Sequence, residues 1–318
     1  MTESQGAELS LNAVAAPLVA QLVAEAALLR LGIDYLDNGC RLIDAGLQLP
    51  GSLEAGRRLA EIALGGLGQV SLHPDMNLPG LGLRLEVRSS QPLLAALASQ
   101  YPGWSLQQGK GRGAYAAWGS GPARALRGDD GLLNQLNYRD RHSKTCLLLD
   151  AEKAPPLDLV DSIAEQCGIE ADELTLVLVP PHSPAGLVLG CARLLGFGLR
   201  KALALGCTAA QILEAAGSVP LPTPAASQVV TAGRCLEAIR WGGQLSLLLR
   251  QDAALAQRLA AKWSLQEVPV LSPQWPPVLP GPAQLGPALL RVTALDSGAQ
   301  AQGGSLDLNR LSQGLSSP

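Results

Sequence analysis

The sequence predicts a layered α/β protein with two domains, because short apolar runs typical of strands alternate with amphipathic runs typical of helices. Hydrophobic residues make up 47% of the chain and charged residues 16%, which is enough apolar material for a large core. The 318 residues are sufficient for one large or two medium domains. We predict an N-terminal α/β domain over residues 1–140 and a C-terminal α/β domain over 141–318.

In the first half, an amphipathic helix is followed by a buried strand and then by a second helix. Ser52 is a suitable N-cap for this second helix, and Glu54 lies in its first turn, where the helix dipole favours an acidic side chain. The predicted helices are 13–31, 52–64 and 92–101, and the predicted strands are 40–47, 69–72, 83–89, a segment near Trp104 and 113–120.

The second half continues the alternation and then changes character. Its predicted strands are 144–150, 174–179 and 244–249, and its predicted helices are 156–167, 185–204, 208–216, 227–241 and 251–263. Seven prolines lie between Pro269 and Pro287, and the tail after Asp296 is rich in Gly, Ser and Gln. This composition predicts an extended, partly mobile tail.

Charge and cysteine content exclude several classes of function. The net charge is −3 and no basic run is present, which argues against a nucleic-acid partner. The N-terminus carries Glu3 and Glu8, unlike a signal peptide, and polar residues and a proline interrupt the apolar stretch 13–33, which argues against a membrane span. Six cysteines without a C-x-x-C pair and three scattered histidines predict free thiols, no metal site and a cytoplasmic location.

The predicted helix 185–204 contains Arg193 inside a run from Leu174 to Leu213 that has no Asp or Glu. Its apolar residues leave almost no polar face, so the helix is expected to be buried. A buried arginine needs a partner, because an unpaired buried charge is costly. Two interpretations remain open: Arg193 pairs with a carboxylate that is distant in the sequence, or it binds a ligand.

Two glycine-containing segments and three carboxylates are further candidates. In 117–126, Gly119 and Gly121 free the backbone for close approach, and the following amides with Arg124 could bind an anion or a ligand carbonyl. The segment 109–113 could cradle a phosphate but is more typical of a solvated hairpin. Glu54 and Glu61 lie seven residues apart on one helix face and, together with Asp44 at a strand end, could form an acidic site, although solvent exposure is the more ordinary interpretation.

Several segments, taken together and in order, resemble the methenyltetrahydromethanopterin cyclohydrolase family over roughly residues 10–245. They are SLNAVA (10–15), NGCRLIDAG (38–46), GSLEAGRRLAEIALGGLG (51–68), LASQYPGW (97–104), WGSGPARAL (118–126), VPPHSPAG (179–186) and AGRCLEAIRWGG (232–243).

The resemblance implies a cytoplasmic, metal-free and cofactor-free hydrolase of one-carbon metabolism, usually a homotrimer, with a pterin cleft between two α/β domains. Water adds to the cyclic methenyl amidinium of a reduced pterin, and a C–N bond then opens to leave an N-formyl group. This chemistry needs a base for the water proton and polar groups around the intermediate. The resemblance assigns Arg193 as catalytic and suggests substrate contacts from Ser99, Gln100, Gly119, Ser120, Gly121, Arg124, Ser183 and Gly186.

One departure from the family pattern affects the expected chemistry. The family places a glutamate three residues after the arginine, in a stretch of the type A-R-x-x-E, whereas this chain has Gly196 there. A carboxylate from another segment could replace it, and the candidates are Asp44, Glu54, Glu61 and Glu237. The alternative functions are a catalytically impaired paralogue that binds a pterin-like ligand, an enzyme for a different cyclic amidine, or a structural oligomer.

Overall fold

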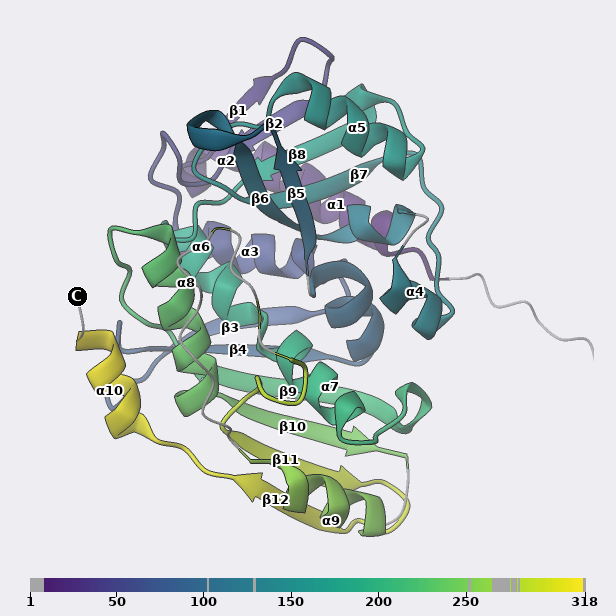
Figure 1. The fold of residues 1–318 in the computed structure, drawn as a ribbon, viewed down its shortest axis with the longest axis vertical. Helices are drawn as coiled ribbons and strands as arrows, with labels where there is room; N and C mark the ends of the chain where they lie inside the picture. Colours follow the sequence, from purple (N-terminus) through teal and green to yellow (C-terminus); the bar gives the residue numbers. More distant parts are fainter. Residues whose placement is uncertain are drawn as a thin grey trace, which may run out of the picture.

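Two six-stranded sheets form the framework of the chain and lie one above the other in the view of Figure 1. The structure is a computed structural model, and it describes residues 9–101, 103–127, 130–250, 253–264, 275, 279 and 281–316. The first sheet has the order β1 (Gly32–Tyr35), β2 (Arg41–Asp44), β8 (Leu174–Leu178), β7 (Thr145–Asp150), β6 (Tyr115–Ser120) and β5 (Trp104–Gln108). The second has the order β12 (Gln300–Gly304), β11 (Leu289–Ala294), β10 (Gln244–Leu249), β9 (Ile212–Pro220), β4 (Leu83–Ser89) and β3 (Gln69–Pro74). The predicted α/β class is therefore confirmed.

Parallel pairing is confined to the middle of the first sheet and to one pair in the second. Strand β8 pairs in parallel with both β2 and β7, and β10 pairs in parallel with β11. The other pairs are antiparallel. Every residue of β7 and β8 is buried, as expected for parallel strands that are covered on both faces.

The helices complete the fold. The α-helices are α1 (Leu11–Ala24), α2 (Ala26–Leu29), α3 (Leu53–Ala63), α4 (Gly131–Leu136), α5 (Leu157–Cys167), α6 (Pro184–Ala192), α7 (Leu194–Ala204), α8 (Gln228–Glu237), α9 (Ala253–Lys262) and α10 (Leu308–Ser316). The π-helices are η1 (Leu93–Gln100) and η6 (Ala238–Gly242), and the short 3-10 helices are η2 (Gly111–Gly113), η3 (Pro122–Leu126), η4 (Ala171–Glu173) and η5 (Ala209–Gln211).

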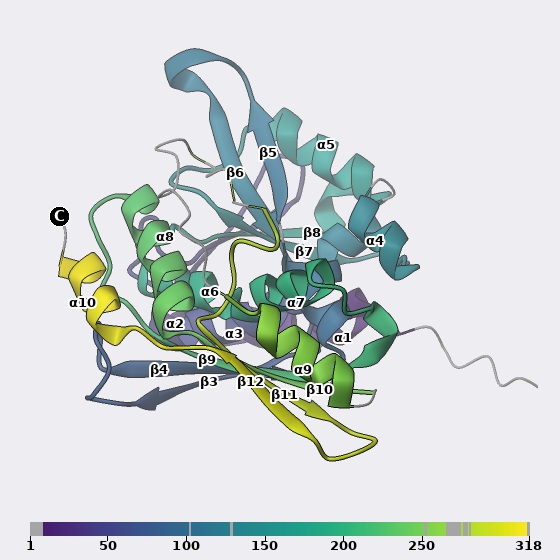
Figure 2. The same cartoon turned by 60° about the horizontal axis from the view of Figure 1, so that its bottom comes forward.

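A helical layer between the two sheets holds most of the core. Helices α1 and α3 contact β7 of the first sheet, whereas α6 and α7 contact β4 of the second. Figure 2 shows the second sheet with α3, α7 and α9 on one side of it. Helix α5 packs in a separate apolar cluster on the opposite face of the first sheet. Buried apolar side chains of the helical layer belong to one large cluster that touches both sheets, so this layer is the place where the sheets meet.

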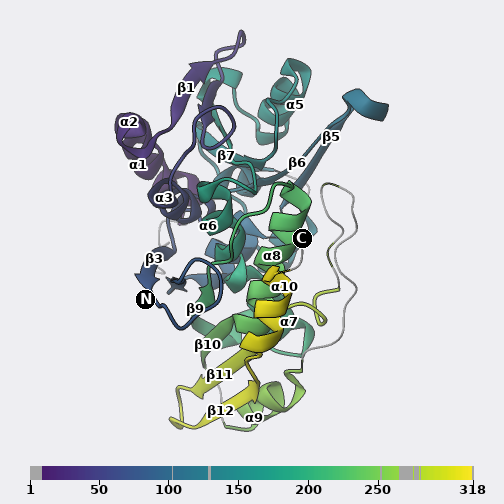
Figure 3. The same cartoon turned by 90° about the vertical axis from the view of Figure 1, so that its left-hand side faces the viewer.

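Most predicted elements are confirmed to within a few residues. The segment 109–113 forms the tip of the β5–β6 hairpin, which projects from the body of the protein (Figure 3), as expected for a solvated turn. The predicted long helix 185–204 is interrupted at Arg193, where α6 ends and α7 begins. The break places the arginine backbone at a junction between two helices instead of inside one.

Two predictions are wrong. The segment 208–216 does not form a helix: η5 is followed by β9, which pairs with β4 on one side and β10 on the other. These two ladders outweigh the helix preference of its alanines. The tail after Asp296 is not simply extended and mobile, because β12 pairs with β11 and α10 packs against η6 and α8. Figure 3 shows α10 beside α8.

The domain division at residue 140 stays a prediction. Each sheet contains strands from both sides of this residue. In the first sheet β5 and β6 lie with β7 and β8, and in the second sheet β3 and β4 lie with β9 to β12. About half of the proline-rich segment 269–287 lies outside the described residues. Within the described ranges, no helix combines the length and apolar character needed to cross a bilayer.

Candidate active site

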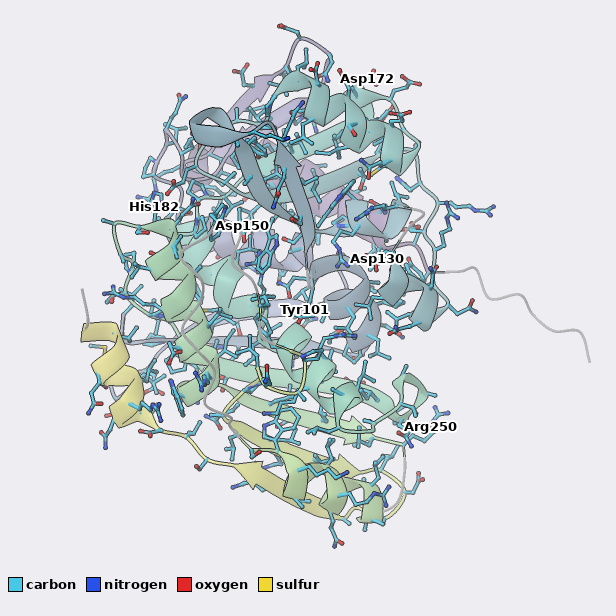
Figure 4. The ribbon with its side chains drawn as sticks, viewed as in Figure 1. Tyr101, Asp130, Asp150, Asp172, His182 and Arg250 are labelled. Atoms are coloured by element: carbon cyan, nitrogen blue, oxygen red, sulfur yellow. The ribbon has the colours of Figure 1, made fainter. Side chains whose placement is uncertain are left out.

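Asp150 and Arg193 form an ion pair between the first sheet and the helical layer. Strand β7 ends at Asp150, and the break between α6 and α7 places Arg193 opposite it, with 2.5 Å between Arg193 Nη2 and Asp150 Oδ2. Ser183 caps α6, which follows β8, so the helix begins at the edge where the parallel strands β7 and β8 end. In open α/β sheets this edge is the usual position of a ligand site. Figure 4 shows Asp150 in the middle of the molecule.

Burial gives this pair its electrostatic character. The side chains of Asp150 and Arg193 are only 5% and 11% exposed. Burial raises the pKa of the Asp150 carboxyl, and the adjacent Arg193 guanidinium opposes that increase through its charge and its hydrogen bond. A carboxylate with a raised pKa is a stronger base than an ordinary aspartate, and the charge of its arginine partner favours the ionised form.

A cavity of about 30 Å³ opens beside the ion pair, with room for water. Helices α6, α7 and α8 and strand β6 supply most of its wall. Its lining residues are Trp118, Asp150, Pro181, Gly186, Gly190, Arg193, Phe197, Ala232, Cys235, Leu236, Trp275 and Leu279. The arrangement therefore places a buried carboxylate, its arginine partner and space for water in one apolar enclosure, which is suited to activating water.

Tyr101 occupies the space beside Gly196. A Cβ atom at Gly196 would lie 2.6 Å from Tyr101 Cβ and 3.0 Å from Tyr101 Cγ. The Tyr101 ring also packs edge-on against Phe197, with 5.1 Å between ring centroids. Tight packing at this turn of α7 therefore leaves no room for a side chain at position 196.

The four carboxylates that the sequence suggested as replacement bases have other partners. Glu54 pairs with Arg57 and Arg58, and Glu61 pairs with Arg57. Glu237 accepts a hydrogen bond from the Trp241 indole and lies 3.6 Å from Arg240.

None of the four suggested carboxylates belongs to the cavity wall in the part of the chain that the structure describes. Asp150 was not among the candidates, although its position at the end of a buried strand was a usable signal.

Asp44, the fourth of these carboxylates, organises the loop that follows β2. Its two carboxylate oxygens accept hydrogen bonds from the backbone N–H groups of residues 46, 47, 48 and 49. Partial burial acts to raise the pKa of Asp44, but these four amides together lower it below its ordinary value. Asp44 thus has a structural task in this chain.

Replacing Asp44 with alanine is expected to lower the free energy of unfolding by about 1.5–3 kcal/mol, since hydrogen bonds to a charged group are lost. Because the pKa of Asp44 is lowered by folding, its contribution is present above its unfolded pKa and disappears as the pH falls through the folded pKa. Urea unfolding of both proteins at neutral and at acidic pH measures this. A destabilisation that does not shrink at acidic pH would show that the carboxylate charge is not involved.

Of the predicted substrate contacts, Gly186 lies in the cavity wall and Ser183 lies just outside it. Ser183 Oγ accepts a hydrogen bond from the Gly186 N–H at 3.0 Å and donates one to the Ala45 carbonyl at 3.4 Å. A Cβ at Gly186 would come within 2.1 Å of the Pro180 carbonyl oxygen, so only glycine fits there. These two residues position the start of α6 and hence Arg193.

Arg124 and its preceding glycines serve the local fold. The Arg124 side chain is buried, donates to the carbonyls of Leu97, Ser99 and Tyr101, and pairs with Asp130 at 2.8 Å. Gly121 has a φ of 119°, which favours glycine, and Gly119 faces Leu147, where a Cβ would lie 3.1 Å from its methyl groups. The guanidinium therefore already has protein partners.

Ser99, Gln100 and Ser120 are completely buried. Among the residues that the structure describes, the two serine hydroxyls and both polar atoms of the Gln100 amide have no hydrogen-bond partner. The Gly121 N–H donates to the Ser99 carbonyl at 3.0 Å, so the two segments that carry these side chains meet. Water commonly satisfies such buried groups. In the described ranges, no group of three or more His, Cys, Asp or Glu side chains is placed to hold a metal ion.

Comparison with known proteins gives consistent matches over most of the chain. The family model described as Cyclohydrolase (MCH) matches residues 10–268. Proteins named methenyltetrahydromethanopterin cyclohydrolase are similar: one from Methylobacterium sp. (strain 4-46) is 41% identical over 251 residues, covering 79% of this chain and 78% of the relative. That of Methylobacillus flagellatus is 36% identical over 313 residues (96% and 94%), and that of Methanococcus maripaludis is 31% identical over 252 residues (77% and 76%).

Proposed function

Since the chain belongs to the methenyltetrahydromethanopterin cyclohydrolase family, we propose that it hydrolyses the cyclic methenyl amidinium of a reduced pterin to the N-formyl form at the Asp150–Arg193 pair. The single observation that carries this site assignment is the buried carboxylate of Asp150, which pairs with Arg193 and lines a cavity that has room for water. Asp150, at the end of β7, thus supplies the acidic group that α7 lacks because it has Gly196.

Asp150 is the base in this proposal. It accepts a proton from water as the water oxygen bonds to the methenyl carbon, which converts the cation into a neutral tetrahedral intermediate. The C–N bond then breaks, the hydroxyl loses its proton to give the formyl C=O, and the departing nitrogen takes up the proton held by Asp150. One proton is released in total, so the charge of the cation is accounted for.

Arg193 keeps Asp150 competent. Without the guanidinium, desolvation alone would favour the protonated carboxyl, which cannot accept a proton from water. The ion pair also holds the Asp150 oxygens in one orientation, as a preorganised base requires. We propose that Ser183 and Gly186 act by placing α6, and that Ser99, Gln100, Gly119, Ser120, Gly121 and Arg124 shape the neighbouring backbone.

The catalytically impaired alternative rested on Gly196, and Asp150 supports the enzyme instead. The test is hydrolysis of methenyltetrahydromethanopterin by the purified protein, followed as the loss of absorbance of the conjugated cation above its spontaneous rate. Turnover supports the proposal. Tight binding without turnover would favour the pterin-binding paralogue, and the absence of both would overturn the substrate assignment.

The rate is expected to fall on the acidic side at a pH above the ordinary aspartate pKa of about 3.9. Burial raises the pKa of Asp150, so protonation removes the base at a higher pH than it would for an exposed aspartate. Below that pKa, kcat falls about tenfold per pH unit. A pH profile of the enzymatic rate, corrected for spontaneous hydrolysis, measures this. A limb at or below the ordinary aspartate value would contradict the assignment of Asp150.

We also propose that the protein is a cytoplasmic homotrimer that needs no metal or cofactor. The support is the family membership and the absence, from the described ranges, of a helix able to span a bilayer. Light scattering coupled to size exclusion gives the number of subunits, and activity after dialysis against a chelator tests the metal requirement.

A further inference from the structure

The cavity beside the ion pair has a wall that lies beyond the family match. Trp275 and Leu279 line it, whereas the matched region ends at residue 268. The Trp275 indole N–H donates to the Asp150 backbone carbonyl at 3.3 Å, so this side chain is attached to the residue that carries the proposed base. A second indole, that of Trp118, lines the same cavity, and the Arg193 guanidinium carbon lies 5.7 Å from its ring centroid.

Two indole rings around a buried carboxylate suit a flat cation better than a neutral ligand. The face of an indole carries negative electrostatic potential and attracts positive charge, with the greatest effect where water is excluded. The Arg193 guanidinium already lies over the Trp118 ring, whereas among the described residues no cation contacts the Trp275 ring. Trp275 is therefore the indole that is open to a cation from the ligand.

We propose that Trp275 is a specificity-determining residue whose indole face covers the cationic methenyl ring of the substrate. This inference rests on the proposed function and names the part of the site that distinguishes substrate from product. The substrate ring is cationic and planar, whereas the N-formyl product is neutral at the same carbon. Trp275 thus strengthens binding of the substrate more than binding of the product.

The size of the cavity adds to this argument. Its volume of about 30 Å³ accommodates water beside Asp150, so a ring that brings its reactive carbon to this water would lie against the wall side chains. Trp275 is one of the two large aromatic side chains of the wall that are only partly buried.

The experiment compares Trp275→Phe, Trp275→Leu and a matched control, Trp263→Phe. Trp263 also donates its indole N–H to a backbone carbonyl, that of Pro287 at 2.9 Å, but its ring packs over Lys201 and is not part of the cavity wall. Each substitution is made in the Asp150→Asn background, where enzymatic hydrolysis is expected to be about 10²–10⁴ slower and the substrate lasts longer during the measurement. Titration calorimetry then gives Kd values for methenyltetrahydromethanopterin and for its N-formyl product.

The leucine variant is expected to weaken substrate binding roughly tenfold and product binding less than threefold, and the phenylalanine variant to keep most of the affinity. The control should match its parent. Equal losses for Phe and Leu would show that only the indole hydrogen bond matters, and equal losses for substrate and product would show that charge is not recognised; either result overturns the inference. If the Asp150→Asn protein binds the substrate as expected but wild type does not turn it over, the proposed function fails while the inference stands. If no variant binds the pterin, both fail.

Discussion

Replacing Asp150 with asparagine is expected to lower kcat by about 10²–10⁴, the usual contribution of a general base. Asparagine has nearly the same shape and can still accept a hydrogen bond from Arg193, but its amide cannot take a proton from water. The KM should change much less than kcat, because the lost interaction belongs to the transition state. Steady-state hydrolysis of methenyltetrahydromethanopterin by wild type and variant measures both constants.

A matched control is available in the β3–β4 hairpin, where Asp75 forms an ion pair with Arg84. Asp75→Asn removes the same charge from the same kind of pair away from the cavity, and kcat should stay within about twofold of wild type. The fold of Asp150→Asn must be checked by its unfolding transition, since breaking a buried ion pair can cost about 3–5 kcal/mol.

The assignment of Asp150 is wrong if its asparagine variant, folded as wild type is, keeps near-normal kcat. In that case glutamine variants of Glu54, Glu61 and Glu237 identify the actual base. Their observed partners are arginines and a tryptophan on their own helices or the next turn, so a role in catalysis would require those pairs to separate.

The architecture could be predicted because local periodicity reports which faces are buried. Strands β4 and β7 and helix α3, including its Ser52 cap, follow the expected ranges closely. Strand β9 could not be predicted in the same way. Its segment is rich in alanine, and what makes it a strand is pairing with β4 and β10, whose residues lie far away in the sequence.

The candidate site shows the same limit. Arg193 could be singled out because a buried arginine without a nearby acid needs a partner. The identity of that partner depends on how β7 meets the junction of α6 and α7, and Asp150 lies 43 residues before Arg193 in the chain. Spacing along one helix could therefore indicate a missing carboxylate but could not locate its replacement. Trp275 is further away still, in a segment whose proline content predicted no regular structure.

Restoring the family glutamate by Gly196→Glu is expected to damage this protein. The new Cβ would lie 2.6 Å from Tyr101 Cβ, a distance that packed side chains do not reach. Overpacking of this kind typically costs about 1–3 kcal/mol, and a buried carboxylate without a dedicated partner adds to the cost. Urea unfolding should therefore show a stability loss of roughly 3 kcal/mol or more, and kcat should not rise above wild type.

Tyr101 cannot simply move aside, because its backbone is held at both ends. Its N–H donates to the Ala96 carbonyl at 2.7 Å, and its own carbonyl accepts from Arg124 at 2.8 Å. The double variant Gly196→Glu with Tyr101→Gly removes both the obstructing Cβ and the ring, so it should be destabilised by less than the sum of the two single changes. Gly314→Glu, at an open position of α10, introduces the same residue without a collision and should leave stability within about 0.5 kcal/mol of wild type.

The outcome separates two chemical designs for the same reaction. If Gly196→Glu is stable and faster than wild type, the space beside α7 is still suited to a glutamate, and Asp150 is an incomplete substitute for it. If it is destabilised and the double variant recovers stability but not rate, Tyr101 has filled that space and the reaction depends on a base from β7. The packing of Tyr101 against Gly196 and Phe197 favours the second result, because a rigid aromatic side chain held by its backbone leaves the arginine only one acidic partner among the described residues.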